Sequence, residues 1–438
     1  MDLSTYTFST VDVWLLNVIE EGYQLDDDRK VPDEWVEEIM VWEGMWYLVP
    51  ACKVRVTDFG MNYLSYRHLG NVVIRMGLKE DSEVMMFDMA IAMASDSTLE
   101  HTTRPTSVSM NILGYATPGL WLLQKGFKGY GYKSATEVAD KFIEDVVLKN
   151  YGKYCDDDLW TWEYIYDESF DKKYYLQSGR SGFSFLGYLR DCAKSKSGNQ
   201  DYFLWLSMVK DKESEYIQWK LHFRSFEEMK KQDFQYYFEY VIDPKKWEEA
   251  WDGYGYLTYQ DESGSEKKVI PFLWFGLINK NHTKDTTKAR FARYDYDLRD
   301  LKVKKTVVDI ALELIGEEKR VKSNILASAL VRDKDMLTEV VPVGSIDAPT
   351  RTVPDLGLVQ KCRMLRKWAV AIPGVEEVEV GDKVRVIFPS GFGDEMTESL
   401  SGDWIVGEIV HLYSFPGQNY MKKVVLVSDR WKSESKDA

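Results

Sequence analysis

Apolar and polar positions alternate along the C-terminal part of the chain. Segment 380–388 (Val-Gly-Asp-Lys-Val-Arg-Val-Ile-Phe) places apolar side chains at about every second position, and branched or aromatic residues also dominate 400–411 and 420–427. Glycine, proline, serine or aspartate residues bound these segments. Such segments are typical of β-strands joined by turns. The pattern predicts a small barrel or sandwich whose edges are covered by the rest of the chain or by another subunit.

A similar arrangement occurs in the N-terminal part. The apolar runs 72–76, 84–93 and 107–113 predict a strand, a long strand and a closing strand, in the same order as in 380–427. A shorter apolar run, 38–42, is predicted as an additional strand. The repeated plan predicts a divergent internal duplication.

Helical patterns appear between these two strand-rich parts. Ser134 and Glu137 have the spacing of a capping box, and apolar residues follow at intervals of four. A second helix is predicted to begin near Phe183. Segments 201–206 and 216–223 are predicted as strands joined by a charged turn. Together these features predict a small α+β domain.

The region after this domain returns to strands and then becomes mixed. Segment 307–315 fits either a helix or a strand, and we predict a helix. A further helix is predicted over 355–368, because Leu358, Cys362 and Leu365 recur at helical spacing. This helix would lead into the C-terminal strands.

The net charge and the cysteines exclude several classes of protein. The chain has 71 acidic and 56 basic residues and a formal charge of −15, which argues against a broad nucleic-acid-binding or membrane-binding surface. The four cysteines form no CxxC motif, so we predict reduced thiols rather than disulfides or a zinc ribbon. We expect no secretion leader and no membrane-spanning segment.

The motifs that would carry chemistry are incomplete. The glycine-rich segment 126–132 lacks the spacing of a phosphate-binding loop, and the acidic triplets 26–28 and 156–158 lack that of a calcium loop. The five histidines form no paired-ligand motif. We therefore predict no catalytic, cofactor or metal site. A pair of hydrolase carboxylates stays open, because such pairs meet only in the folded protein.

Two compositional features suggest contacts with other molecules. Aromatic residues make up 14% of the chain and lie along strands, which favours protein interfaces, although they also suit sugar binding. Basic residues gather in 290–299 and continue to Lys322. This basic segment is either a solvated helix face or a surface that docks onto an acidic neighbour.

The last strand-rich segment also contains the candidates for structural roles, which are Gly381, Asp382, Gly402, Trp404 and His411. Both Gly-Asp pairs stand where a tight turn precedes a strand, and Gly402 is expected to adopt a backbone angle that other residues resist. Trp404 is expected in a central, buried strand. His411 is expected at the end of that strand, with a hydrogen-bonded structural role.

The order of these elements resembles that of the central baseplate hub proteins of contractile-tailed bacteriophages, which are related to hubs of other contractile injection systems. The likeness is carried by the three C-terminal strand segments, by the helix that begins at Ser134 and by the helix-then-strand unit at 183–206. It is firm over 100–148, 183–206 and 376–427.

The resemblance implies an α+β, mainly β fold with two barrel- or sandwich-like tube domains, a small α+β domain between them and a mixed insertion in the second. The expected divisions are a first tube domain with an N-terminal extension at 1–127, the small domain at 128–225, a discontinuous second tube domain at 226–290 and 367–431, the insertion at 291–366, and a polar tail at 432–438.

The resemblance also implies a function. Members of this family are homotrimeric baseplate hubs that adapt the sixfold tail tube to the threefold central spike and leave a channel for DNA. The partners would be the spike protein, the tail tube or tube-initiator protein and other baseplate proteins, with DNA passing through the lumen without specific binding. The protein would be made in the host cytoplasm and reside in the virion tail baseplate. The alternative is a glycan-binding or cell-wall-degrading tail enzyme.

Overall fold

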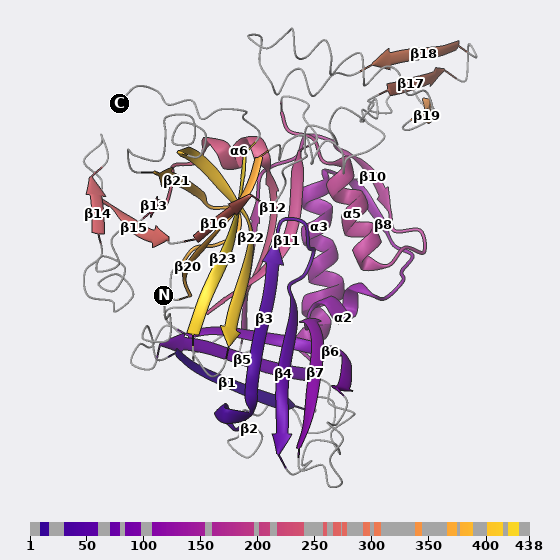
Figure 1. The fold of residues 1–438 in the computed structure, drawn as a ribbon. Helices are drawn as coiled ribbons and strands as arrows, with labels where there is room; N and C mark the ends of the chain where they lie inside the picture. Colours follow the sequence, from indigo (N-terminus) through magenta and orange to yellow (C-terminus); the bar gives the residue numbers. More distant parts are fainter. Residues whose placement is uncertain are drawn as a thin grey trace.

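The structure is a computed structural model that describes 256 of the 438 residues of the chain. The described residues are 9–16, 30–59, 71–78, 84–97, 107–153, 160–196, 201–210, 217–240, 257–260, 266–272, 274–277, 292–297, 302–307, 338–343, 366–374, 377–388, 401–414 and 419–428. Strands predominate and the helices are few and short (Figure 1). The predicted α+β, mainly β class is therefore confirmed.

The first β module contains five strands in a single antiparallel order, β3-β4-β7-β6-β5, which β1 and β2 extend. The bounds of its strands are β1 Ser9–Leu16, β2 Lys30–Val31, β3 Val36–Gly44, β4 Ala51–Phe59, β5 Asn71–Leu78, β6 Val84–Ser97 and β7 Ser107–Ala116. A short 3-10 turn, η3 (Asp33–Trp35), precedes β3. Figure 1 shows β1 and β5 running across the lower halves of β3 and β4, so the sheet coils strongly.

The second β module has the order β16-β20-β23-β22-β21, again antiparallel throughout, and β13, β15 and β14 continue it beyond β21. Its bounds are β13 Tyr236–Tyr240, β14 Leu257–Gln260, β15 Glu266–Phe272, β16 Trp274–Leu277, β20 Arg366–Pro373, β21 Lys383–Ile387, β22 Gly402–Ser414 and β23 Asn419–Ser428. When the five core strands of each module are numbered in chain order, both modules have the sheet order 1-2-5-4-3.

The two modules also agree in register. One row of the first module joins Met40, Lys53, Leu113 and Met93 across β3, β4, β7 and β6. The matching row of the second module contains, in the same order, Gly276, Ala369, Val425 and Glu408. The long strand of each module has a register shift immediately before this row, at Ile91/Met93 in β6 and at Val406/Glu408 in β22. The five-stranded plan is thus present twice.

Both modules belong to one continuous sheet, because β22 pairs with β3. β21 occupies one edge of β22 over 402–405, and β3 takes over the same edge from 408 onward, while β23 lines the opposite edge. The bulge at Gly407 separates these two pairings. A bulge bends its strand and increases the local twist, which suits a strand that passes from one neighbour to another.

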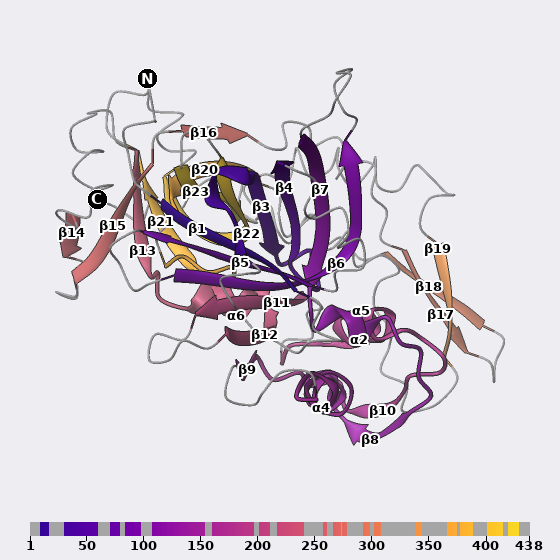
Figure 2. The same cartoon turned by 90° about the horizontal axis from the view of Figure 1, so that it is seen from below.

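The small α+β domain lies beside the two modules (Figures 1 and 2). Its elements are α2 Gly119–Leu122, β8 Gly129–Lys133, α3 Ala135–Ile143, the π-helical turn η5 Glu144–Leu148, α4 Lys149–Tyr151, β9 Trp160–Tyr166, β10 Lys173–Leu176, α5 Gly182–Cys192, β11 Tyr202–Lys210, β12 Ile217–Ser225 and α6 Phe226–Lys231. Strands β11, β12 and β9 form a sheet in that order, and β8 and β10 form a separate two-stranded ribbon.

Local sequence signals explain these helices. Ser134 Oγ accepts from the backbone N–H of Glu137, and the Glu137 carboxylate accepts from the N–H of Ser134, so the predicted capping box is formed. α3 buries Val138 and Phe142 as expected from their spacing. The second predicted helix is α5, whose N-cap is Ser181.

Strand β11 connects the interiors of the two modules. Phe203 and Trp205 belong to the buried core of the second module, whereas the intervening Leu204 and Leu206 belong to the core shared by the first module and the helices. Successive side chains of a strand point to opposite faces. One strand therefore fills two cores.

Two predicted helices are tested by the structure at one end only. Residues 366–368 begin strand β20, so the helix predicted over 355–368 is wrong at its C-terminal end, and the remainder lies outside the described residues. Pairing of β20 with β16 and β23 overrides the helical spacing of its apolar residues. Val307 ends strand β18, and 308–315 lie outside the described residues.

The basic segment is not a helix where the structure describes it. Strands β17 (Ala292–Asp297), β18 (Lys302–Val307) and β19 (Thr338–Val343) form a separate small sheet in the order β18-β17-β19. The interpretation of a solvated helix face is therefore wrong for 292–297 and 302–307, because these residues pair as strands. Among the described helices, none is long and apolar enough to cross a membrane.

Candidate functional site: the junctions of the β modules and the small domain

The backbones of the two modules meet closely at a pair of glycines. The N–H of Met45 donates to the carbonyl of Gly407 over 2.9 Å. A Cβ at Gly407 would lie 2.6 Å from the Trp46 ring, and one at Gly44 would lie 3.1 Å from the Gly407 carbonyl oxygen. Larger side chains at these positions would force β3 away from β22. The glycines therefore permit the strand pairing that joins the modules.

A buried polar group lies next to this contact. His411 Nε2 lies 3.0 Å from Glu43 Oε1, and His411 Nδ1 lies 2.8 Å from the Tyr420 hydroxyl. The three side chains are all buried, and the Phe87 ring meets the imidazole edge-on at 5.0 Å between ring centres. These residues come from β3, β22, β23 and β6, so the group connects both modules.

The electrostatics of this group indicate a neutral imidazole. Burial lowers the pKa of His411, with Glu43 acting in the opposite direction, and burial raises the pKa of Tyr420 well above its ordinary value. With a neutral ring, Nε2–H donates a hydrogen bond to the Glu43 carboxylate, and Nδ1 accepts a hydrogen bond from the Tyr420 hydroxyl. Such an arrangement satisfies both ring nitrogens and fits a structural role. His411 lies inside β22, which continues to Ser414, and not at a strand end as expected.

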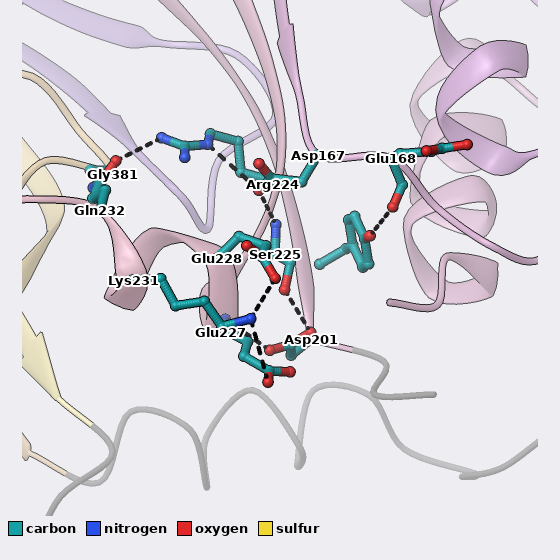
Figure 3. A network of polar contacts seen from close by, with 11 residues as sticks. Asp167, Glu168, Asp201, Arg224, Ser225, Glu227, Glu228, Lys231, Gln232 and Gly381 are labelled. Atoms are coloured by element: carbon teal, nitrogen blue, oxygen red, sulfur yellow. Dashed lines mark hydrogen bonds and ion pairs between the residues drawn. The ribbon is translucent and has the colours of Figure 1, made fainter. Parts of the chain in front are cut away.

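A second junction connects the small domain to the second module (Figure 3). Arg224, near the end of β12, donates from a terminal guanidinium nitrogen to the Gln232 side-chain oxygen over 3.1 Å. Gln232 Nε2 in turn donates to the Gly381 carbonyl over 2.7 Å. The Asp167 carboxylate lies 3.5 Å from Arg224 Nε and accepts from the Ser225 N–H over 2.8 Å. This chain of contacts extends from β9 to the turn before β21.

The start of α6 is held by the same network (Figure 3). The Asp201 carboxylate accepts from the Ser225 hydroxyl and from the Glu227 N–H, each over 3.0 Å. Backbone donors at a helix start have no partner within the helix, so a side-chain acceptor stabilises the first turn. Asp201 therefore fixes the helix that carries Met229 into the second core.

Gly381 and Asp382 form the turn that faces this network. Gly381 has a φ of +96°, and a Cβ there would lie 2.9 Å from the Trp205 ring. Asp382 Oδ2 accepts from the Glu379 N–H over 2.9 Å. Burial raises the pKa of Asp382 to about 7. Lys220 of β12 also pairs with Glu379, with 2.9 Å between Nζ and Oε1.

The remaining candidates lie in β22. Gly402 has a φ of +116°, which lies in a region of backbone conformation that residues other than glycine rarely adopt. Trp404 is 2% exposed and lies in the second core with Ile405 and Val406. Together with Gly381, Asp382 and His411, these residues fall at the two junctions or in the core of one module.

Sequence reasoning did not single out the partners of these residues. Glu43 and Tyr420 lie in strands recognised from their apolar patterns, but a buried carboxylate is not visible in such a pattern. The described residues contain no group of three or more His, Cys, Asp and Glu side chains placed to hold a metal ion. The chemistry of these junctions is that of assembly and positioning.

Within the described part of the chain, one edge of strand β6 differs from the corresponding edge of β22 in the other module. In the second module, β3 covers the edge of β22 that β21 leaves after residue 405. In the first module, β5 leaves the corresponding edge of β6 after Ala90, and no described strand takes its place over 91–97. Unpaired edges of this kind are templates for pairing with another strand.

Comparisons with known proteins give structural neighbours only. No protein-family model matches the sequence, and no curated protein matches it. The fold is similar to the tail protein from Neisseria meningitidis MC58, with 8% identity and a TM-score of 0.48 over 96% of this chain and 97% of that one. It is also similar to the 43 kDa tail protein of prophage MuSo2 from Shewanella oneidensis, with 8% identity and a TM-score of 0.49 over 96% and 98%.

A third neighbour is the E. coli c3393 protein, a component of the type VI secretion system, with 6% identity and a TM-score of 0.45 over 90% of this chain and 73% of that one. These three neighbours are two tail proteins, one of them from a prophage, and a secretion-system component. At these identities the likeness concerns the course of the backbone.

Proposed function

We propose that this protein is a structural subunit of a contractile-tail baseplate, a homotrimeric hub that adapts the sixfold tail tube to the threefold central spike. The observation that carries the proposal is the repeated five-stranded module with one covered and one uncovered edge. The covered edge is that of β22, which β3 occupies within the chain. The uncovered edge, to which none of the described strands pairs, is that of β6 over 91–97.

The strand that would cover this edge follows from the match between the modules. β16 occupies the position in the second module that β3 occupies in the first. Since β3 pairs with β22 inside the chain, β16 of one copy would pair with β6 of the next copy. Met40 faces Leu412 within the chain. The same register would place Gly276 opposite Ser97 and Leu277 opposite Asp96 of the neighbouring copy.

Repetition of this contact gives a closed ring in which first and second modules alternate. Such a head-to-tail contact closes when the rotation between copies divides the circle. Three copies, the number implied by the resemblance to baseplate hubs, would present six similar modules around a channel. The tube would meet the sixfold side and the spike the threefold side, each as a separate protein.

The charge of the chain supports passage of DNA without binding. Three copies carry a formal charge of three times −15, or −45. Like charges repel, so an acidic channel wall would keep the phosphate backbone from adhering. A basic channel wall in an assembled particle would contradict this part of the proposal.

The experiment that tests the proposal is cysteine crosslinking of the purified protein after measurement of its mass. We expect a trimer in solution and, for the variant Asp96→Cys/Leu277→Cys, disulfide-linked species of two and three chains on a non-reducing gel. Directly opposite residues in antiparallel strands lie about 4.5–5.5 Å apart, within the range that a disulfide spans. Asp96→Cys alone and Leu277→Cys alone, each added to the four native cysteines, should give monomers on the same gel.

A matched control is Asp96→Cys/Thr258→Cys, because Thr258 lies in β14 at the opposite end of the sheet. It should not crosslink beyond the single variants. A monomeric protein, or crosslinking that is equal in both double variants, would contradict the ring. Degradation of purified cell wall by the protein would favour a tail enzyme instead.

A further inference from the structure

A second surface, unrelated to the strand edges of the two modules, exposes apolar side chains on the small domain. Phe127, Tyr132, Tyr174 and Leu176 are 86%, 64%, 78% and 59% exposed. The Tyr132 and Tyr174 rings contact each other with 5.7 Å between their centres. Tyr132, Tyr174 and Leu176 form the outer face of the β8–β10 ribbon, and Phe127 lies two residues before β8. The ribbon lies at the margin of the molecule in both views (Figures 1 and 2).

The backbone is built to place Tyr132 on this face. Tyr130 is buried and stacks on Phe185 with 5.5 Å between ring centres. In a regular strand Tyr132 would point to the same side as Tyr130. The register shifts by one residue at Gly131, so Tyr130 pairs with Tyr175 while Tyr132 pairs with Tyr174. The bulge thus re-aims one large aromatic side chain from the core to solvent.

The surroundings of this outer face are basic although the protein is acidic. Segments 119–134 and 172–182 contain no aspartate or glutamate, and their charged residues are Lys125, Lys128, Lys133, Lys172, Lys173 and Arg180. Some of this charge is engaged locally, since Lys128 pairs with Asp145 and Arg180 lies over the Tyr188 ring. The pKa of Glu137 is lowered, mainly by hydrogen bonds from Ser134 and to a smaller extent by the charges of Lys133 and Lys172.

The pairing within the ribbon places two lysines in one row, although Lys173 Nζ also lies 4.9 Å from the centre of the Tyr175 ring. Lys133 and Lys173 are directly opposite each other across the two strands, next to the Tyr132–Tyr174 pair. Like charges directly opposite in a sheet are destabilising. The ribbon has only two described strands, so β8 and β10 each have an outer edge without a described neighbour. A third strand with an acidic residue in the lysine row would offset this repulsion.

We propose that the β8–β10 ribbon is a docking site for an extended acidic segment of another protein, which adds to the ribbon as a third strand. The segment would place an apolar residue in the row of Tyr132 and Tyr174 and an acidic residue in the row of Lys133 and Lys173. Main-chain hydrogen bonds at a free edge provide affinity in such strand addition, and alternate side chains provide specificity. The proposal does not depend on the ring described above.

Other ligands fit this surface less well. Lysine and arginine only donate hydrogen bonds, whereas sugar hydroxyls require acceptors as well. Single-stranded nucleic acid favours basic grooves with aromatic platforms, but the chain has a net charge of −15 and part of the local basic charge is already paired. An acidic protein segment satisfies both the ring row and the lysine row.

The test is binding of synthetic peptides to the full-length protein, measured by fluorescence anisotropy. The probe is a peptide of about ten residues, the length of a long strand, in which valine and glutamate alternate. We expect this peptide to bind, and we expect its affinity to fall as the salt concentration increases. The matching valine–lysine peptide should bind at least about tenfold more weakly, a difference of about 1.4 kcal/mol.

Three variants define the site. Tyr132→Ala/Tyr174→Ala should weaken binding by about tenfold or more. The charge reversal Lys133→Glu/Lys173→Glu should exchange the preference between the two peptides, so that the valine–lysine peptide binds better than the valine–glutamate peptide. Tyr47→Ala, which removes another exposed tyrosine away from the ribbon, should bind like the unaltered protein.

The proposal is overturned if the glutamate peptide does not bind, if both peptides bind equally, or if the variants have no effect. Stronger binding of oligothymidylate than of the glutamate peptide would assign the surface to nucleic acid instead. A change in the mass of the protein in solution that is caused by Tyr132→Ala/Tyr174→Ala would assign the surface to a second copy of the chain. Circular dichroism of each variant separates loss of binding from loss of folding.

Discussion

Glu43 of β3 and His411 of β22 lie 3.0 Å apart inside the protein, although 368 positions separate them in the sequence. The two side chains meet where the first and second modules share one sheet. A slip of one residue between β3 and β22 would turn every side chain of one strand to the other face and separate this pair. The contact therefore ties the pairing of the modules to a single register.

We expect substitutions at Glu43 and His411 to have coupled effects on the free energy of unfolding. Glu43→Leu or His411→Leu alone should destabilise the protein by about 1–3 kcal/mol, because each leaves a buried polar partner without its hydrogen bond. The double variant should cost much less than the sum of the two changes. Urea unfolding of the four proteins measures the coupling.

The control pair is Lys53 and Glu38, which lie 2.8 Å apart on the more exposed part of the same sheet. Their coupling should stay below about 1 kcal/mol, as for other solvent-exposed ion pairs. Additive effects of the Glu43 and His411 substitutions would show that the buried contact contributes no stability of its own.

Acid should weaken the fold through His222. Burial lowers the pKa of this histidine to about 3, and its Nε2 lies 2.9 Å from the Ser207 hydroxyl. The unfolded chain takes up a proton below about pH 6.5, whereas the folded protein does not until about pH 3. The free energy of unfolding should fall as pH decreases between these values. His222→Gln should give a flatter profile in urea titrations from pH 7 to 4, and an unchanged slope would contradict the prediction.

Asp382 should act in the opposite direction. Its folded-state pKa is raised to about 7 by burial, so the folded protein binds the proton more tightly than the unfolded chain does. This group therefore stabilises the folded state as pH falls from about 7 to about 4. Asp382→Asn should be more stable than the unaltered protein at pH 8, by an amount that vanishes near pH 4. Thermal unfolding across this range checks the trend, and a pH-independent difference would argue against it.

Removal of the Trp404 ring should be costly. The side chain is almost fully buried among Val384, Ile405 and other residues of the second core. Trp404→Ala should destabilise the protein by about 3–5 kcal/mol through lost burial and the cavity left behind. Tyr47→Ala, at a side chain 43% exposed, should cost much less. Similar melting temperatures for the two variants would contradict the assigned core.

A methyl group at Gly381 should disturb the turn that faces the small domain. The positive φ and the nearby Trp205 ring both oppose it, and we expect a loss of about 1–3 kcal/mol for Gly381→Ala. Gly129→Ala is the matched control, because a Cβ there meets nothing within 4 Å. Equal stability of the two variants, compared by urea unfolding, would show that the turn tolerates a side chain.

Several elements were predictable because their signals are local. The capping box at Ser134 and Glu137 fixes a helix start through atoms three residues apart. Strands such as β4 and β21 alternate at a period of two because one face is buried. The apolar spacing before residue 366 misled the prediction, because β20 becomes a strand through its partners β16 and β23.

The repeated succession of a strand, a long strand and a closing strand along the chain was thus indicated by the sequence alone, since periodicity and turn residues act over a few positions. The folded chain decided which edges meet. The pairing of β3 with β22, the buried contact of Glu43 with His411, and the outward turn of Tyr132 at Gly131 all depend on residues brought together from distant or differently registered strands. A pattern of apolar positions records which residues are buried, and it does not record the partner against which they are buried.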